Sequence, residues 1–168
     1  GMSRRSFLQI LGAGLLVTTY AETADGAPAN ATAPEGSVAA RLHIAEDGRI
    51  TVMTGKVEVG QGARKQFTMA AAEELRAPVA SVNVIMGDTA LTPDDGGTFG
   101  SRTTPSNIPN VRKACAAARR LLAEGAARRW QVDLSGVSLA DGFAWHEPTD
   151  QRASYGELAA DEGIAAAF

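Results

Sequence analysis

Leu42-His-Ile-Ala-Glu-Asp-Gly-Arg-Ile-Thr-Val52 alternates apolar and polar residues on both sides of a short turn sequence. Such alternation places the apolar side chains on one face of a strand, and Glu46-Asp47-Gly48 supplies residue types that favour a tight turn. The stretch therefore predicts a β-hairpin with one buried face.

The period of the apolar residues changes after this hairpin. From Gly62 to Leu75 apolar side chains fall four residues apart, which predicts an amphipathic helix closed by Pro78. Alternation returns over residues 82–86 and predicts a further strand. A second, longer helix is expected from about Asn110 to Trp130, with Cys115 on its buried stripe.

The C-terminal part repeats the hairpin pattern. Residues 137–145 alternate around the turn Asp141-Gly142, and Ser154-Tyr-Gly-Glu157 has the spacing of a capping box that begins a short helix. The sequence thus predicts an α+β fold, with two hairpins and a further strand packed with two main helices. We expect one small domain over residues 38–168, after a leader.

Residues 1–31 have the pattern of an export leader. They resemble a twin-arginine signal: Arg4 and Arg5 form the pair, and a mostly apolar run extends from Ile10 to Val17. That run is too short for a membrane span, which needs roughly 20 residues, and small residues at 29–33 offer cleavage sites. Signals of this class carry proteins that fold before export, often with a cofactor inserted, so we expect a periplasmic protein. Residues 32–37 predict a linker, and Gly1 indicates a tag remnant.

Composition excludes several classes of site. A formal net charge of -3 gives no electrostatic case for nucleic-acid binding. The single cysteine excludes an intramolecular disulfide and a cysteine-rich metal or iron–sulfur site. His43 and His146 lie far apart on strand patterns, so we expect neither a metal held by protein ligands nor a histidine general base. The arginines and lysine of the second helix are interpreted as a solvated face.

The sharpest local feature is the Gly60-Gln61-Gly62 turn between strand pattern and helix pattern. Its glycines permit a tight turn and close approach of a ligand, and the helix that follows offers unpaired N–H groups to an oxo or phosphate oxygen. Gln61 adds a neutral amide donor. From the residues alone, a plain strand-to-helix connection is the favoured explanation of the turn. Glu58 is a titratable neighbour without a partner that would define a mechanism.

A second candidate is the loop Gly96-Gly-Thr-Phe-Gly-Ser-Arg-Thr-Thr104, part of a long irregular stretch. Its glycines, hydroxyls and one guanidinium suit a phosphate or pterin edge. The alternatives are a subunit contact or a mobile surface loop.

Gly55-Lys-Val-Glu-Val-Gly-Gln-Gly62 resembles the molybdopterin-binding segment in the large subunit of the xanthine oxidase family. The longer register is most similar to the isoquinoline 1-oxidoreductase β-subunit or aldehyde dehydrogenase type. The resemblance covers essentially the whole chain. Its other motifs, in order, are the leader, the hairpin Leu42–Val52, Ala72-Glu-Glu-Leu75 and Ser154-Tyr-Gly-Glu-Leu158.

The resemblance implies a molybdopterin cofactor in a dinucleotide form, whose apical molybdenum oxygen receives a hydrogen bond from Gln61. Gly60 and Gly62 are carried over as the turn that presents this glutamine. It also implies oxidation of aldehydes or N-heterocycles with oxygen taken from water.

In the family, a glutamate base and most cofactor contacts lie beyond the segment matched here. We therefore expect the chain to work with the remaining part of the molybdenum subunit, a [2Fe–2S] subunit and a cytochrome c, and not to be active alone. A non-catalytic exported protein-binding module and a truncated gene remnant are the alternatives.

Overall fold

The structure is a computed structural model that describes residues 14–18 and 40–161. Its main sheet has four strands in the order β1-β2-β3-β4. They are β1 (Gly14–Thr18), β2 (Ala40–Ala45), β3 (Ile50–Thr54) and β4 (Val82–Met86). The hairpin β2–β3 pairs Leu42 with Val52, as the alternating pattern predicts. Strand β4 runs parallel to β3, which requires a crossover, and helix α2 provides it.

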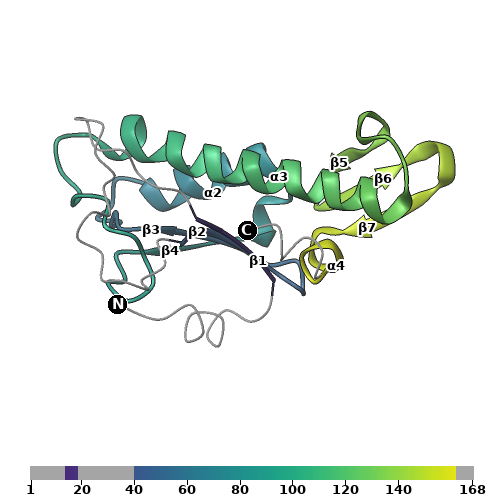
Figure 1. Ribbon diagram of the computed structural model, residues 1–168. Coiled ribbons are helices and arrows are strands. Elements are labelled where there is room, and N and C mark those ends of the chain that lie inside the picture. Colours follow the sequence, from purple (N-terminus) through teal and green to yellow (C-terminus); the bar gives the residue numbers. More distant parts are fainter. Residues whose placement is uncertain (1–13, 19–39, 162–168) are drawn as a thin grey trace.

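Helices α2 (Ala63–Leu75) and α3 (Ile108–Trp130) lie side by side over one face of this sheet (Figure 1). The core between sheet and helices is aliphatic, with Phe67 and Tyr155 as its fully buried aromatic residues. Small residues on both helices, such as Ala71 and Ala118, are completely buried and allow the two helices to approach closely. A π-helical turn (Thr103–Asn107) leads directly into α3, so the helical segment begins several residues before the predicted start.

Arg112 and Arg119 of α3 reach across to α2. Arg112 forms ion pairs with Glu73 and Glu74, and Arg119 donates to the main-chain oxygen of Glu74 at 2.8 Å. These two arginines therefore help to join the helices, whereas the basic band as a whole was interpreted from the sequence as a solvated face. Lys113, Arg128 and Arg129 do lie exposed.

A second sheet contains β5 (Ser138–Ala140), β6 (Phe143–His146) and β7 (Gln151–Ser154), in that order. Helix α4 (Tyr155–Ala159) follows β7 with the predicted capping box, since Ser154 and Glu157 exchange hydrogen bonds. Short 3-10 turns connect the elements at Val79–Ser81, Leu134–Gly136 and Glu147–Thr149. The buried Tyr155 hydroxyl donates to the Leu75 oxygen at 2.7 Å and fastens this unit to the end of α2.

Strand β1 was not predicted. The sequence pattern of these residues indicates the apolar run of a leader, and it predicts a folded domain that begins near Val38. In the structure, Gly14–Thr18 pairs antiparallel with β2, and Leu15 and Val17 are 1% and 3% exposed. A short apolar run is compatible with a leader or a buried strand, and periodicity alone does not separate them. The arginine pair, the cleavage sites and the linker lie outside the described residues.

The predicted α+β class and its two hairpins, further strand and two main helices are confirmed. Within residues 14–18 and 40–161, no helix combines the length and apolar character that a membrane crossing requires.

Candidate functional site

Both candidate loops leave the same edge of the main sheet. The segment containing Gln61 follows the carboxyl end of β3, and the long stretch containing residues 96–104 follows the carboxyl end of β4. Because β3 and β4 are neighbouring parallel strands, their carboxyl ends meet at one edge, which is where open α/β sheets commonly bind ligands. The topology therefore brings together two segments that were separate candidates in the sequence.

The Gln61 side chain is fixed by its own loop. Its amide nitrogen donates to the Val57 oxygen at 2.9 Å, and its amide oxygen accepts from the Val59 N–H at 2.6 Å. Gly60 and Gly62 have φ values of +97° and +78°, a backbone conformation that favours glycine. A primary amide carries two N–H bonds, so one donor hydrogen of Gln61 remains on an exposed side chain without a partner among the described residues.

Glu58 precedes α2, and its carboxylate accepts hydrogen bonds from N–H groups at the beginning of that helix. One of its carboxylate oxygens accepts from the N–H groups of Gly60 and Gly62 at 2.8 and 3.0 Å, and the other accepts from the Arg64 N–H at 2.9 Å. The Arg64 bond, followed by those of the turn, outweighs desolvation and holds the pKa of Glu58 below its usual value. These N–H groups were expected to be available to an oxo or phosphate oxygen, but Glu58 already satisfies them. The side chain of Gln61 still has one N–H bond that it can donate to a ligand.

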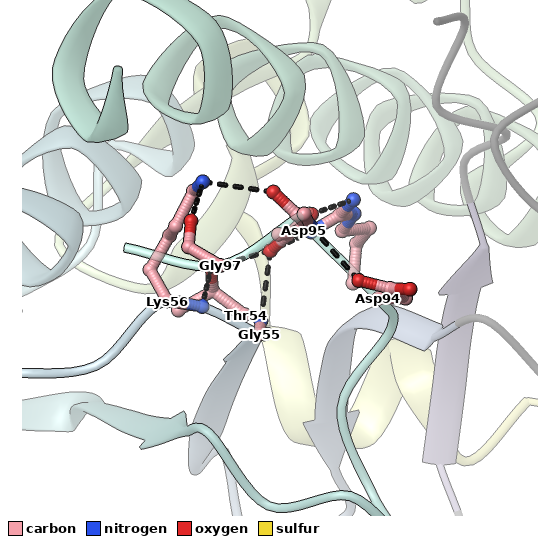
Figure 2. Close-up of polar contacts among 8 residues, drawn as sticks. Thr54, Gly55, Lys56, Asp94, Asp95 and Gly97 are labelled. Carbon is pink, nitrogen blue, oxygen red and sulfur yellow. Dashed lines mark hydrogen bonds and ion pairs between the residues drawn. The ribbon is translucent and has the colours of Figure 1, made fainter. Parts of the chain in front are cut away.

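Asp95 anchors the second loop to the sheet (Figure 2). Arg41, on β2, donates to both carboxylate oxygens at 2.8 and 2.5 Å, and the two side chains are each 1% exposed. The Thr54 hydroxyl and the Gly55 N–H add bonds of 2.7 and 2.8 Å at the end of β3. Burial alone would raise the pKa of Asp95, but the hydrogen bond and charge of Arg41 outweigh it and hold this pKa low.

Gly55 is required for this approach. A side-chain Cβ at Gly55 would lie 2.3 Å from the Pro93 oxygen and 2.9 Å from the Asp95 nitrogen. Both obstacles are backbone atoms, which cannot turn aside as a flexible side chain can. Any larger residue would therefore push the Asp95 segment away from the end of β3.

Lys56 and Val57 join the two candidate loops directly. Lys56 is 3% exposed, and its ammonium donates to the main-chain oxygens of Asp95, at 2.8 Å, and of Gly97 (Figure 2). The Val57 N–H donates to the Thr98 hydroxyl at 2.8 Å, and further along the Thr104 hydroxyl donates to the Gln66 amide oxygen. The loop is thus tied to its neighbour at several points, in contrast to the mobile surface loop that was one alternative.

The surface of the two loops is open where a ligand would approach. At Gly60, Gly62 and Gly96 an added Cβ would meet nothing within 4 Å, and each has a positive φ. Ser101 and Arg102 lie exposed on the same loop as Gly96. Gln61 offers a neutral amide donor, and Ser101 and Arg102 offer a hydroxyl and a guanidinium. These donor types suit an oxygen-rich anionic group such as a pterin phosphate. Among the described residues, no cluster of three or more histidine, cysteine or acidic side chains could hold a metal ion.

The remaining candidates are structural. Cys115 is fully buried on α3, and desolvation raises the pKa of its thiol to about 12, so it behaves as a small apolar residue. His43 is buried in β2, and His146 contacts the Thr149 hydroxyl at 2.7 Å at the end of β6. Both histidines lie on strands, as predicted.

Sequence reasoning missed Arg41, Lys56 and Asp95, the buried charges that hold the site together. The available signals were a lysine directly after the end of a strand and an aspartate pair before two glycines. Neither identifies its partner, because 54 residues separate Arg41 from Asp95 and 39 separate Lys56 from Asp95.

Comparison with known proteins places this arrangement in a family. Residues 3–167 match the family described as the molybdopterin cofactor-binding domain. The chain is 32% identical to the isoquinoline 1-oxidoreductase beta subunit of Brevundimonas diminuta, over 99% of this chain and 23% of that protein. It is also 34% identical to the gamma subunit of the 6-hydroxypseudooxynicotine dehydrogenase complex of Paenarthrobacter nicotinovorans, over 71% of this chain and 15% of the relative.

Another relative is the xanthine dehydrogenase molybdenum-binding subunit of Escherichia coli O157:H7, which is 43% identical over 45% of this chain and 10% of that protein. The chain thus spans less than a quarter of the length of these curated relatives.

Two solved structures share the fold. Reconstituted CO dehydrogenase from Oligotropha carboxidovorans matches with a TM-score of 0.64 and 20% identity, over 86% of this chain and 18% of that one. Quinoline 2-oxidoreductase from Pseudomonas putida 86 matches with a TM-score of 0.59 and 22% identity, over 75% and 16% of the two chains. The family match and the isoquinoline relative each extend over nearly all of the chain. The chain therefore belongs to the molybdopterin cofactor-binding domain family.

Proposed function

We propose that this chain is the N-terminal, cofactor-contacting part of a molybdenum hydroxylase that oxidises aldehydes or N-heterocycles with oxygen derived from water. The observation that carries the proposal is the Gln61 amide, which its own loop fixes while one N–H bond remains for a ligand. The family membership supports molybdopterin as that ligand.

Gln61 donates a hydrogen bond to the cofactor and does not ligate the metal. Because Val57 and Val59 already hold its amide, this donor needs no reorientation when the cofactor binds, and pre-organised donors are the effective ones in catalysis. Gly60 and Gly62 give the turn its shape, and an added Cβ at either glycine would meet nothing within 4 Å. The bound cofactor supplies the redox chemistry of the hydroxylation.

The loop of residues 96–104 forms the second wall of this site. Its exposed Ser101 and Arg102 provide a hydroxyl and a positive charge for an anionic part of the cofactor. Lys56 and Asp95 keep the loop beside the Gln61 turn and have no direct contact with the ligand in this proposal.

The complete enzyme needs further parts. We propose that the remaining part of the molybdenum subunit supplies the general base and most cofactor contacts, and that this chain alone is inactive. The names of the isoquinoline and 6-hydroxypseudooxynicotine relatives identify each as one subunit, which supports an assembly. In our proposal electrons pass to a [2Fe–2S] subunit and then to a cytochrome c, the cofactor has a dinucleotide form, and the assembly is periplasmic.

Substitution of Gln61 in the complete enzyme tests the proposal. We expect Gln61→Ala to lower kcat by roughly 10- to 1000-fold, the range seen when one catalytic hydrogen-bond donor is lost. Gln61→Glu keeps the size of the side chain but removes its donor and should show a similar loss. Lys65→Ala, an exposed position on the next turn, is the matched control. Unchanged steady-state rates for both Gln61 variants, with molybdenum content and circular dichroism unaltered, would rule out the assigned role.

A further inference from the structure

Strand β1 consists of residues that have the sequence pattern of an export signal. The apolar run from Ile10 to Val17 overlaps Gly14–Thr18, which forms the outermost strand of the main sheet (Figure 1). Its pairing with β2 aligns Gly14 with Ala45 and Val17 with Leu42, and a register shift follows before Thr18. The outer edge of β2 is therefore occupied along nearly its full length.

The docked strand is also part of the main core. Leu15 and Val17 are almost fully buried in the cluster that joins the sheet to the helices, and β1 contacts both α3 and α4. Release of β1 would expose the apolar side chains that cover it and leave the outer N–H and C=O groups of β2 without backbone partners. The edge of β2 thus fits an extended segment with aliphatic residues at alternate positions.

Gly14 is adapted to docking. A Cβ at this position would lie 2.1 Å from the main-chain oxygen of Ile44, and the φ value of +148° is one that side-chain-bearing residues rarely adopt. An apolar leader does not require glycine at this position, since alanine would keep the segment equally apolar. Two separate features of Gly14 therefore match the requirements of the sheet edge.

We propose that the outer edge of β2 is a binding surface for Gly14–Thr18, and that docking there competes with recognition of these residues as part of an export signal. This inference rests on the proposed export role of residues 1–31. A strand whose backbone pairs with β2 and whose side chains lie in the core cannot present those groups to another receptor at the same time. On a route that carries folded proteins the domain folds first, so β1 docks before export and must be released for it.

The test begins with hydrogen exchange on the intact chain. We expect the amides of Leu15 and Val17 to be protected from exchange, and Gly14→Ala to increase their exchange rate about tenfold or more. Thr18→Ala changes an exposed side chain of the same strand and should leave the rates unaltered. In the host, Gly14→Ala should raise the fraction of processed chain in the periplasm, because its leader stays apolar while its docked form is weakened.

Two further variants separate a failure of the export role from a failure of the proposed competition. Leu15→Ala removes a core contact without a backbone clash, so it serves if Gly14→Ala fails to fold, and it should also raise the processed fraction. Conversion of Arg4 and Arg5 to lysine should abolish export while leaving β1 protected. Export of that variant at the wild-type rate would refute the export role itself. Unprotected β1 amides in the wild-type chain, or release of β1 in Gly14→Ala with no change in processing, would overturn the competition.

Discussion

Asp95→Asn changes few atoms, but the structure predicts that it lowers the free energy of unfolding strongly. The substitution leaves the Arg41 guanidinium, which is 1% exposed, without its counter-charge. It also places an amide NH2 group where the wild-type carboxylate oxygen accepts hydrogen bonds. Removal of one partner from a buried ion pair costs about 3–5 kcal/mol. For a chain of this length that loss corresponds to a decrease in Tm of roughly 10 °C.

The assay is urea denaturation of the intact chain followed by far-ultraviolet circular dichroism. Asp94→Asn is the matched control: it removes the same charge from the neighbouring residue, which is exposed and can still accept from the Gly96 N–H. The control should change the free energy of unfolding by less than about 0.5 kcal/mol. The double variant Arg41→Met with Asp95→Asn should recover part of the loss, because it no longer buries an unpaired guanidinium.

The effect has a defined pH dependence. The pKa of Asp95 in the folded protein lies below its ordinary value of 3.8, so the ionised carboxylate stabilises the fold at every pH above that value. The difference between wild type and Asp95→Asn should therefore be constant near neutral pH and shrink as the pH falls through the folded pKa. An Asp95→Asn variant no less stable than Asp94→Asn would refute the assignment of Asp95 as the anchor of this loop.

Three further predictions concern residues around the site and core. Burial raises the pKa of the Cys115 thiol to about 12, so the thiol should react with a thiol reagent at about pH 8 only when the protein unfolds. Rapid labelling of the native chain would contradict the burial of Cys115. Tyr155→Phe should lower the free energy of unfolding by about 1–2 kcal/mol, because the buried Leu75 oxygen loses its donor, and an unchanged denaturation midpoint would count against that bond. Glu58→Gln should accelerate amide exchange at Gly62 near neutral pH. The difference in exchange rate from wild type should disappear as the pH falls below the lowered pKa of Glu58. Equal exchange rates at neutral pH would show that the carboxylate does not hold the turn.

Local patterns predicted the elements of this fold well. Strict alternation around Glu46-Asp47-Gly48 gave the β2–β3 hairpin, and the four-residue spacing from Ala63 to Leu75 gave α2. The capping box at Ser154 gave the start of α4. Each of these signals lies within about a dozen residues, the range over which periodicity and turn chemistry determine structure.

Features that depend on distant contacts were not predicted. Strand β1 forms because Leu15 and Val17 find a core built by later elements, and nothing in the run itself distinguishes that outcome from an apolar leader. The same holds for Asp95, whose role depends on Arg41 arriving from β2. At the site, a short sequence pattern was enough to identify the Gly60-Gln61-Gly62 turn. The hydrogen bonds from the neighbouring N–H groups to Glu58 were not predicted, because they depend on side-chain geometry that no short motif encodes.

The molybdenum and pterin content of the tagged chain, isolated intact from its own host, tests most directly whether this chain contacts a molybdenum cofactor. We predict about one molybdenum and one pterin per chain, recovered together with a larger companion polypeptide. Recovery of the folded chain without molybdenum, pterin or companion would contradict the account and leave Gln61 as an ordinary turn residue.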